Sequence, residues 1–304
     1  MATSPQGVPY EQLAHYVNAD GQCIFTRCWA PPTDIEIRAL CLVLHGAAEH
    51  SGPYDRLAIP LTGCGVMVYA HDHVGHGQSQ GDQMDITDFN IYIRDTLQHV
   101  DVITSKHPNL PIFLFGHSLG GAIAILTAME RPEQFTGVVM TGPAITVHKK
   151  LTSSLTMNLL RFTSYWFPKH ELDKINPEHV SRDPKEVELY RTDPLVWHGG
   201  LKARFVAKAT AAFQQIQNNM SSIEWPFLIL HGDADNLCDI NGSKMLVERA
   251  KSTDKHLQVY PGHYHALICE PPKDAAVVIR DITSWIVRRI PENATKPDDV
   301  HYRD

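Results

Sequence analysis

Short apolar runs alternate with helical patterns along most of this chain, and the alternation limits the possible folds more than any other feature. Six runs have the length of buried strands and are bounded by Gly or Pro: 39–44, 66–70, 111–115, 137–140, 226–230 and 256–260. Helical patterns lie between and after them, at 88–105, 119–130, 242–250 and 274–289. The alternation predicts a mostly parallel sheet with helices on both faces, and residues 16–20 and 23–29 predict a hairpin at one edge.

The alternation stops once, between residues 146 and 222, where only helical patterns and polar turns occur. This stretch is too long for a structureless loop inside a compact domain, so we expect a helical lid inserted into the core. The core then consists of residues 1–145 and 223–290, and the charged residues 291–304 are expected to form a flexible tail.

One helical pattern in the insertion carries an apolar stripe. The stripe consists of residues spaced for one face of a helix, namely Leu151, Leu155, Leu159, Phe162 and Trp166. It can pack on the domain below, or it can also meet a lipid surface. Both roles are compatible, because Trp166 and Phe167 add more apolar bulk than docking alone needs.

Charge and targeting signals exclude several classes of protein. The formal net charge is −7 without a Lys/Arg cluster, which argues against nucleic-acid binding. The first residues have no basic and apolar signal-peptide pattern, and no apolar run is long enough to span a bilayer. The six cysteines lack metal-site spacing, so we expect reduced thiols in an intracellular protein.

The pentapeptide Gly116-His117-Ser118-Leu119-Gly120 lies between the predicted strand 111–115 and the predicted helix 119–130. A sharp turn between a strand and a helix holds a serine hydroxyl at the carboxyl edge of the sheet, and glycines on both sides let the backbones pass closely. The pentapeptide alone is a weak signal, but this context makes Ser118 the expected nucleophile.

A serine nucleophile needs a general base and a carboxylate that orients the base, and both follow it in this type of fold. Strand 226–230 runs into a loop with Asp233 and Asp235, and strand 256–260 runs into a loop with His263 and His265. We favour Asp235, because Asp233 is nearer the strand end and could be a turn residue. We favour His265, because His263 is at the start of its loop, and both alternatives remain open.

The tetrahedral intermediate of acyl transfer needs two backbone N–H donors. One is expected from Leu119, which follows the nucleophile. The other is expected from the turn after strand 39–44, with Ala47 as the favoured donor.

A competing motif, His71-Asp72-His73-Val74-Gly75-His76, approximates the ligand pattern of dinuclear metallohydrolases. Gly75 stands where that pattern needs an aspartate, so the ligand set is incomplete and we expect no metal and no other cofactor. The alternative is a loop that packs beside the site and positions the nucleophile turn.

Several stretches together resemble the monoacylglycerol lipase (monoglyceride lipase) family of α/β-hydrolases, over most of the chain. They are YVNADG from Tyr16, HGAAEHSGPY from His45, AHDHVGHGQS from Ala70, GHSLGGAIAILTAMERP from Gly116, DPL from Asp193, GLK from Gly200, DADNLCD from Asp233 and HYHAL from His263.

The resemblance implies hydrolysis of monoacylglycerols to a fatty acid and glycerol, in a cytosolic protein that binds membranes peripherally through its lid and often forms a homodimer. It matches Ser118, Asp235 and His265 to the catalytic residues, and Ala47 and Leu119 to the oxyanion donors. Residues matched to the polar end of the substrate pocket are Glu49, His117 and Tyr190. Pro53 and Ile268 depart from the residues expected near the glycerol.

Two thiols, Cys238 and Cys269, follow the expected acid and base closely, so we expect thiol-reactive compounds to block the pocket. Two other functions remain open at this stage. The same chemistry could act on a lysophospholipid or a short-chain ester. An inactive lipid-binding protein is disfavoured, because it would need none of the three catalytic residues.

Overall fold

The computed structural model describes residues 2–146 and 154–292. Its centre is an eight-stranded sheet in the order β1-β2-β4-β3-β5-β6-β7-β8. The strands are β1 His15–Val17, β2 Cys23–Trp29, β3 Ala39–Leu44, β4 Val66–His71, β5 Ile112–His117, β6 Gly137–Thr141, β7 Phe227–Gly232 and β8 Lys255–Tyr260. The helices of the core are α1 Asp55–Thr62, α2 Asn90–Lys106, α3 Leu119–Glu130, α7 Ile240–Arg249 and α8 Pro272–Val287.

The six central strands pair in parallel, and the β1–β2 hairpin adds an antiparallel edge through the pairing of β2 with β4. The predicted mostly parallel sheet and the predicted hairpin are therefore confirmed. Strand β5 ends at His117, two residues later than predicted, because its ladder with β6 continues to the pair His117 and Thr141. Parallel strands bring their carboxyl ends to one edge, and this edge carries the candidate site.

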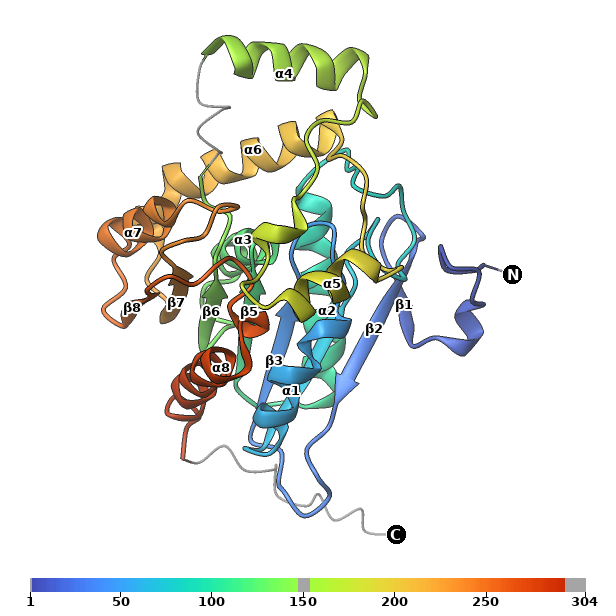
Figure 1. Cartoon of the computed structure of the whole chain (residues 1–304). Coiled ribbons are helices and arrows are strands. Elements are labelled where there is room, and N and C mark those ends of the chain that lie inside the picture. The colour runs from blue at the N-terminus through green and yellow to red at the C-terminus, as the bar shows by residue number, and fades with distance from the viewer. Residues whose placement is uncertain (1, 147–153, 293–304) are drawn as a thin grey trace.

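Each face of the sheet is covered by its own apolar core. Along β3, Leu40, Leu42 and Leu44 belong to the core beneath α2 and α3, whereas Cys41 and Val43 belong to the core beneath α1 and α8. Alternate residues of a strand point to opposite faces, so a strand buried on both sides must be apolar throughout. Figure 1 shows α1 and α8 on one side of the sheet and α3 on the other.

Helix α1 was not predicted from the sequence. It contains Pro60, which lacks the N–H of a helical hydrogen bond and normally interrupts a helix. The helix forms because Leu57, Ala58 and Leu61 are fully buried against the sheet and α8. Tertiary contacts therefore outweigh the local penalty here.

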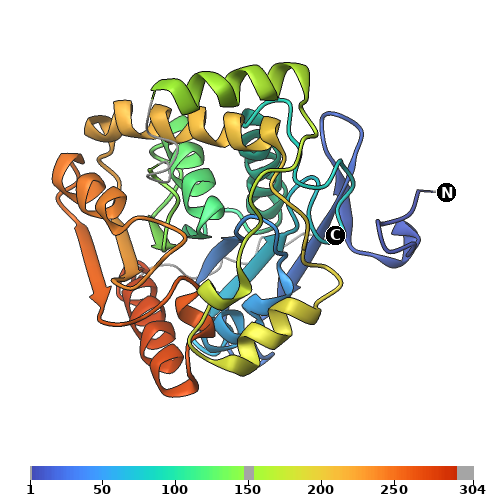
Figure 2. The same cartoon turned by 45° about the horizontal axis from the view of Figure 1, so that its top comes forward.

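Among the described residues, three α-helices lie between β6 and β7, in the region predicted to be a helical insertion: α4 Ser154–Trp166, α5 Pro184–Thr192 and α6 Ala203–Asn219. A short 3-10 helix, η4 (Pro177–His179), precedes α5. Figures 1 and 2 place α4 on the outer side of α6, away from the sheet. Leu160 is buried in this contact, whereas Leu159, Phe162 and Trp166 of the predicted stripe are 62%, 57% and 63% exposed.

Leu151 of that stripe and residues 293–304 of the predicted tail lie outside the described residues. Within the described ranges, no helix has the length and apolar character needed to cross a bilayer.

Candidate active site

Ser118 lies in a strained turn between β5 and α3. Its φ of 53° and ψ of −116° are unfavourable for a residue with a side chain, and such strain persists only where the surroundings enforce it. A Cβ on Gly116 would lie 2.4 Å from the carbonyl oxygen of Gly120, and a Cβ on Gly120 would lie 2.0 Å from that of Leu44. The glycines of the pentapeptide are therefore required by close backbone contacts.

Asp235 and His265 form a buried pair at the ends of β7 and β8. His265 Nδ1 lies 2.7 Å from Asp235 Oδ2, and both side chains are almost fully buried. The second carboxylate oxygen of Asp235 accepts hydrogen bonds from the backbone N–H groups of Leu237 and Cys238, at 2.8 and 2.9 Å. The orientation of the carboxylate is therefore fixed before any substrate binds.

The electrostatics of this pair suit a general base. Burial opposes the charged form of His265, but the charge of Asp235, the hydrogen bond that His265 donates to Asp235 and the charge of Glu49 raise its pKa above the usual value. Burial also opposes the charge of Asp235, yet His265 and the hydrogen bonds from His231 and Cys238 hold the pKa of Asp235 well below its usual range. Asp235 is thus a carboxylate that stabilises a proton on His265.

The alternative acid and base occupy structural positions in their loops. Asp233 accepts a hydrogen bond from the N–H of Gly262 at 2.6 Å, which joins the two loops. The Nδ1 atom of His263 lies 2.9 Å from the carbonyl oxygen of Pro261 in its own turn. The structure brings Asp235 together with His265 and leaves the other two side chains outside this pair. Sequence reasoning missed His231, whose Nε2 lies 3.2 Å from Asp235 Oδ2, although it stands in the same loop motif.

Two further side chains contact the candidate nucleophile and base. Within the described chain, Ser118 Oγ makes its hydrogen-bond contact with Cys238 Sγ, at 3.8 Å. The His117 ring lies 4.6 Å from the His265 ring, centre to centre, and burial together with the nearby His265 lowers the pKa of His117 to about 4. His117 is therefore neutral at neutral pH, and its Nδ1–H donates to the carbonyl oxygen of Thr141 at 3.1 Å.

The turn after β3 lies directly against Ser118. A Cβ on Gly46 would lie 3.1 Å from the Cβ of Ser118, and Ala48 adopts a φ of 64° in the same turn. The N–H groups of Ala47 and Leu119 donate no hydrogen bond to any residue that the structure describes. Leu119 is the first residue of α3, where helical N–H groups have no partner within the helix.

The three residues predicted at the polar end of the pocket have different surroundings. Glu49 Oε1 accepts hydrogen bonds from the N–H of Gly46 and, at 2.6 Å, from the hydroxyl of Tyr54, so this oxygen holds the turn after β3. Burial and the charge of Glu49 raise the pKa of Tyr190. The phenol of Tyr190 is therefore neutral at neutral pH.

A chain of buried histidines supports the same turn. The N–H of His73 donates to His45 Nε2 at 2.9 Å, so His45 carries its proton on Nδ1, which donates to the carbonyl oxygen of Gly46. His73 Nε2–H donates back to the His45 carbonyl oxygen, and His73 Nδ1 lies 3.2 Å from His71 Nε2. His71 Nδ1 lies 3.1 Å from His99 Nδ1. Burial lowers the pKa of His71 to about 3, so the chain is neutral at neutral pH.

This arrangement refines the expectation for the loop at 71–76. The loop supports the turn at His45 through hydrogen bonds, whereas it was expected to position the nucleophile turn. Asp72 accepts hydrogen bonds from the N–H and hydroxyl of Ser51 and from the N–H of Gln78. In the described part of the chain, no group of three or more His, Cys, Asp or Glu side chains is arranged to hold a metal ion.

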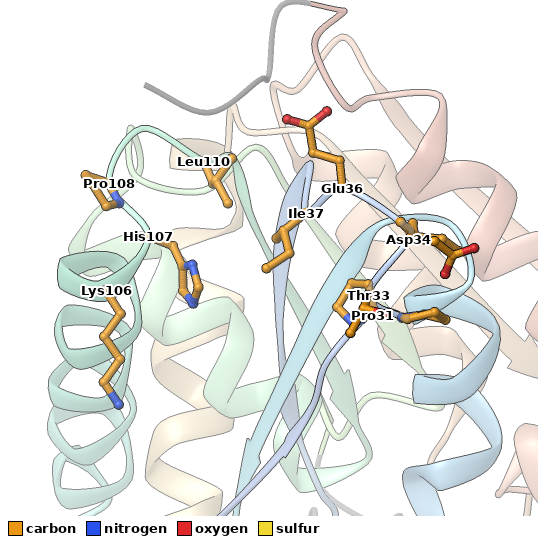
Figure 3. Close-up of a pocket in the computed structure, with 11 residues that line it drawn as sticks. Pro31, Thr33, Asp34, Glu36, Ile37, Lys106, His107, Pro108 and Leu110 are labelled. Carbon is orange, nitrogen blue, oxygen red and sulfur yellow. The ribbon is translucent and has the colours of Figure 1, made fainter. Parts of the chain in front are cut away.

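A cavity of about 790 Å³ lies at the opposite edge of the sheet (Figure 3). It is lined by residues 31–37, which lead into β3, and by residues at the end of α2 and the start of β5, including Lys106, His107 and Leu110. In parallel α/β folds, ligands bind at the carboxyl ends of the strands. This cavity at the amino ends is therefore separate from the candidate active site.

Known proteins resemble this chain in sequence and in fold. A family model described as serine aminopeptidase, S33 matches residues 35–272. The monoglyceride lipase of Mus musculus is 44% identical over 287 residues, 94% of each chain. The chain therefore belongs to the monoglyceride lipase family. The Homo sapiens member is 43% identical over 286 residues, again 94% of each chain.

A crystal structure of the family extends the comparison to three dimensions. The Paleococcus ferrophilus monoacylglycerol lipase matches with a TM-score of 0.76 at 30% identity, over 88% of this chain and 99% of that chain. The predicted α/β-hydrolase fold and the predicted family are confirmed, and the protein is a serine hydrolase. The roles of the individual site residues stay predictions.

Proposed function

We propose that this protein hydrolyses monoacylglycerols to a free fatty acid and glycerol through an acyl-enzyme on Ser118. The proposal rests most on one arrangement: the His265 ring of the buried Asp235–His265 pair packs against His117, the residue before the strained Ser118, and two backbone N–H groups of the neighbouring turns have no partner in the described chain. Family membership supports the substrate, because the relatives from mouse and human are named monoglyceride lipases.

In the proposed reaction, Ser118 Oγ turns from Cys238 to His265 Nε2 and attacks the ester carbonyl as His265 takes its proton. Asp235 holds the Nδ1–H side of His265, so that Nε2 faces the serine and the imidazolium is stabilised. The same imidazolium then gives its proton to the leaving glycerol oxygen. Water repeats the cycle with His265 as base, which releases the fatty acid and restores Ser118.

The negative charge of the tetrahedral intermediate needs donors that are already in place. We assign this role to the N–H groups of Ala47 and Leu119. The neutral histidine chain and Glu49 hold the turn that carries Ala47, because both bond to the backbone of Gly46 or His45. The donor geometry then costs no reorganisation during the reaction.

The glycerol end of the substrate is assigned to Glu49, His117 and Tyr190. Nε2 of the neutral His117 is an acceptor, since its Nδ1–H is used by Thr141, and the Tyr190 phenol is a donor and acceptor. Pro53 and Ile268 supply no side-chain polar group, and Arg56 reaches this region through its bond to the Ile268 carbonyl oxygen. Head-group selection therefore depends on a small set of hydrogen bonds.

The insertion is assigned the role of a lid that meets the membrane in a cytoplasmic, peripherally bound enzyme. The exposed apolar residues of α4 support this role, since Tyr165 and Phe167 are 77% and 62% exposed beside the stripe. The resemblance to the family also implies a homodimer. The mass of the full chain in solution, measured by sedimentation, tests this assignment.

A second candidate substrate keeps the same chemistry, because the triad acts on any carboxylic ester that fits. Rates with 2-oleoylglycerol, oleoyl lysophosphatidylcholine and a water-soluble butyrate ester, at equal concentration of titrated sites, separate these candidates. We expect the highest kcat/KM with 2-oleoylglycerol. A higher kcat/KM with either of the other esters would contradict the proposed substrate.

Labelling with a fluorophosphonate probe separates an enzyme from an inactive lipid-binding protein. We expect stoichiometric labelling that is lost in Ser118→Ala and prevented by 2-oleoylglycerol. Labelling that survives in Ser118→Ala would assign the reactive group to another residue and contradict the proposed site.

A further inference from the structure

The loop that carries His265 is joined to the insertion by a buried ion pair. The Glu270 side chain has no exposed surface, and its Oε2 accepts a hydrogen bond from Arg182 Nε at 2.6 Å. Arg182 lies between η4 and α5, and its Nη2 also donates to Asp274 Oδ2 at 2.5 Å, at the start of α8. A carboxylate is rarely buried so completely unless it is paired, and loss of either partner is then costly.

The other oxygen of Glu270 points to the neighbour of His265. Oε1 accepts the N–H of Tyr264 at 2.7 Å. On the other side of His265, the N–H of Ala266 donates to the carbonyl oxygen of Val180 at 2.8 Å. Both amides that flank His265 therefore have fixed partners, and each connection leads to residues 180–182 of the insertion.

A third contact belongs to the same junction. The hydroxyl of Ser181 donates to the carbonyl oxygen of Cys269 at 2.7 Å, one residue before Glu270. Three successive residues of the insertion thus bind the loop from Tyr264 to Glu270. Neither Arg182 nor Glu270 contacts the His265 ring among the hydrogen bonds and ion pairs of the described residues.

We propose that Arg182 and Glu270 are positioning residues that keep His265 Nε2 aligned with Ser118. This inference rests on the proposed function, because it presupposes that His265 is the general base. Its physical basis is the sensitivity of proton transfer to geometry, since a misplacement of about 1 Å can lower the rate about 100-fold. Glu270 bonds to the backbone N–H of Tyr264 and not to the His265 ring, so it acts through the backbone of the loop.

The ion pair also makes the insertion part of the catalytic unit. Without the Arg182 charge, the Glu270 carboxylate is buried without its cation and is expected to turn towards water or admit water. Either change weakens its hydrogen bond to the Tyr264 N–H and frees the loop. Substrate binding is not expected to change to the same extent, because neither side chain is assigned to the pocket.

The experiment compares Arg182→Met, Glu270→Gln and the double variant in the full-length protein. Rates with 2-oleoylglycerol are normalised to active sites titrated to completion with a fluorophosphonate, so that unfolded molecules are not counted. We expect kcat to fall ten- to 100-fold in each single variant, with KM changed less than threefold. The rate of fluorophosphonate labelling should fall by a similar factor, because it also needs the base.

The pairwise nature of the contact is tested by two further comparisons. The double variant should be no slower than the slower single variant, since both changes remove one interaction. Arg182→Lys should recover part of kcat, because it keeps the positive charge beside Glu270. If Arg182→Met gives no active sites that can be titrated, kcat of Arg182→Lys is compared with kcat of the unchanged protein instead. We then expect kcat to be at least threefold lower in Arg182→Lys, and an equal kcat would contradict the inference.

Arg191→Met is the matched control, because Arg191 lies in the same insertion and pairs with Glu178 and Glu188 at the surface. Its kcat should stay within twofold. A kcat within twofold for both Arg182→Met and Glu270→Gln, or an equal loss in Arg191→Met, would overturn the inference. Ser118→Ala is measured in parallel: turnover that survives in it contradicts the proposed function instead, whatever the Arg182 variants show.

Discussion

Two parts of the insertion between β6 and β7, here called the outer half and the inner half, precede α6 in the chain and are held in different ways. The outer half is α4, which packs on α6 through Leu160 and leaves most of its large apolar side chains exposed. The inner half, residues 177–197, contains η4, α5 and the turn after α5. It is tied to the core by ion pairs and backbone hydrogen bonds on both sides of the candidate site.

The inner half contacts both loops that the proposed reaction needs. On one side, the N–H of Trp197 donates to the carbonyl oxygen of Ala48 at 2.8 Å, and His50 Nε2 lies 2.9 Å from Asp193 Oδ2. On the other side, Arg182 binds Glu270 in the histidine loop. Directional polar contacts fix the inner half, whereas the buried contact of α4 with α6 is made by the apolar side chain of Leu160.

We infer that the two parts of the insertion serve two different tasks. We assign the alignment of catalytic groups to the inner half and contact with the lipid surface to the outer half. Changes to the outer half should alter activity only where substrate is presented in a membrane. Changes to the Asp235–His265 pair, whose histidine loop is bound by the inner half, should lower the rate with every substrate.

The largest effect on activity is expected from a change to the Asp235–His265 pair. Asp235→Asn should lower kcat about 10⁴-fold with soluble and membrane-bound esters alike, because an amide no longer holds the proton of His265 on Nδ1. Asp233→Asn is the control, since Asp233 bonds to the N–H of Gly262, and its kcat should stay within a few-fold. Equal losses in the two variants would show that the loops, and not the pair, carry the effect.

The next effect should appear only with membrane-bound substrate. Replacing Leu159, Phe162 and Trp166 together by serine should weaken binding to phosphatidylcholine vesicles at least tenfold, because each exposed side chain can bury apolar surface worth about 1.5–3 kcal/mol. Activity on a soluble butyrate ester should not change. The measurement is vesicle flotation together with both activities.

The matched control replaces exposed apolar residues of other elements, Val17, Ile59 and Leu189, by serine. These residues are 51%, 64% and 59% exposed, so this variant also removes exposed apolar surface, from smaller side chains and outside α4. Vesicle binding of this control should match that of the unchanged protein. A comparable loss of binding in both triple variants would contradict a specific role of α4.

Adjacent residues of α4 allow a smaller test of how the outer half is held. Leu160→Ala should weaken the docking of α4 by about 2–3 kcal/mol, because Leu160 is buried against α6. Leu159→Ala should change the free energy of docking by less than about 0.5 kcal/mol, because Leu159 is 62% exposed. Hydrogen exchange of the α4 amides measures both, and equal protection in the two variants would refute this orientation of the helix.

The smallest effect concerns pH. The base form of His265 is needed for attack, so activity should be lost as the pH falls through the raised pKa of His265. Glu49→Gln removes one charge that raises this pKa and should move the acidic limb of kcat/KM to lower pH, by less than about one unit. Glu188→Gln on the surface of α5 is the control. A limb that moves to higher pH would contradict this role of Glu49.

Much of the fold could be predicted because the central strands are buried on both faces and appear as continuous apolar runs. The positions of Asp235 and His265 after β7 and β8 also located the buried pair that the structure brings together. Both signals are local. A parallel sheet converts them into a three-dimensional arrangement by bringing the strand ends to one edge.

Other features depend on distant parts of the chain and could not be predicted. Arg182 and Glu270 are 88 positions apart, and nothing near either residue indicates the other. The orientation of α4 depends on which face meets α6, and its sequence has apolar residues on more than one face. Helix α1 forms despite Pro60, because burial compensates for the missing hydrogen bond.

The central claim is that Ser118 carries the acyl group of a monoacylglycerol during turnover. Mixing the protein with 2-oleoylglycerol, quenching in acid within the first turnovers and mapping the peptides by mass spectrometry tests it directly. We predict an oleoyl ester on the peptide that contains Ser118, and loss of both this adduct and oleate release in Ser118→Ala. An adduct on another residue, or oleate release that persists in Ser118→Ala, would contradict the account.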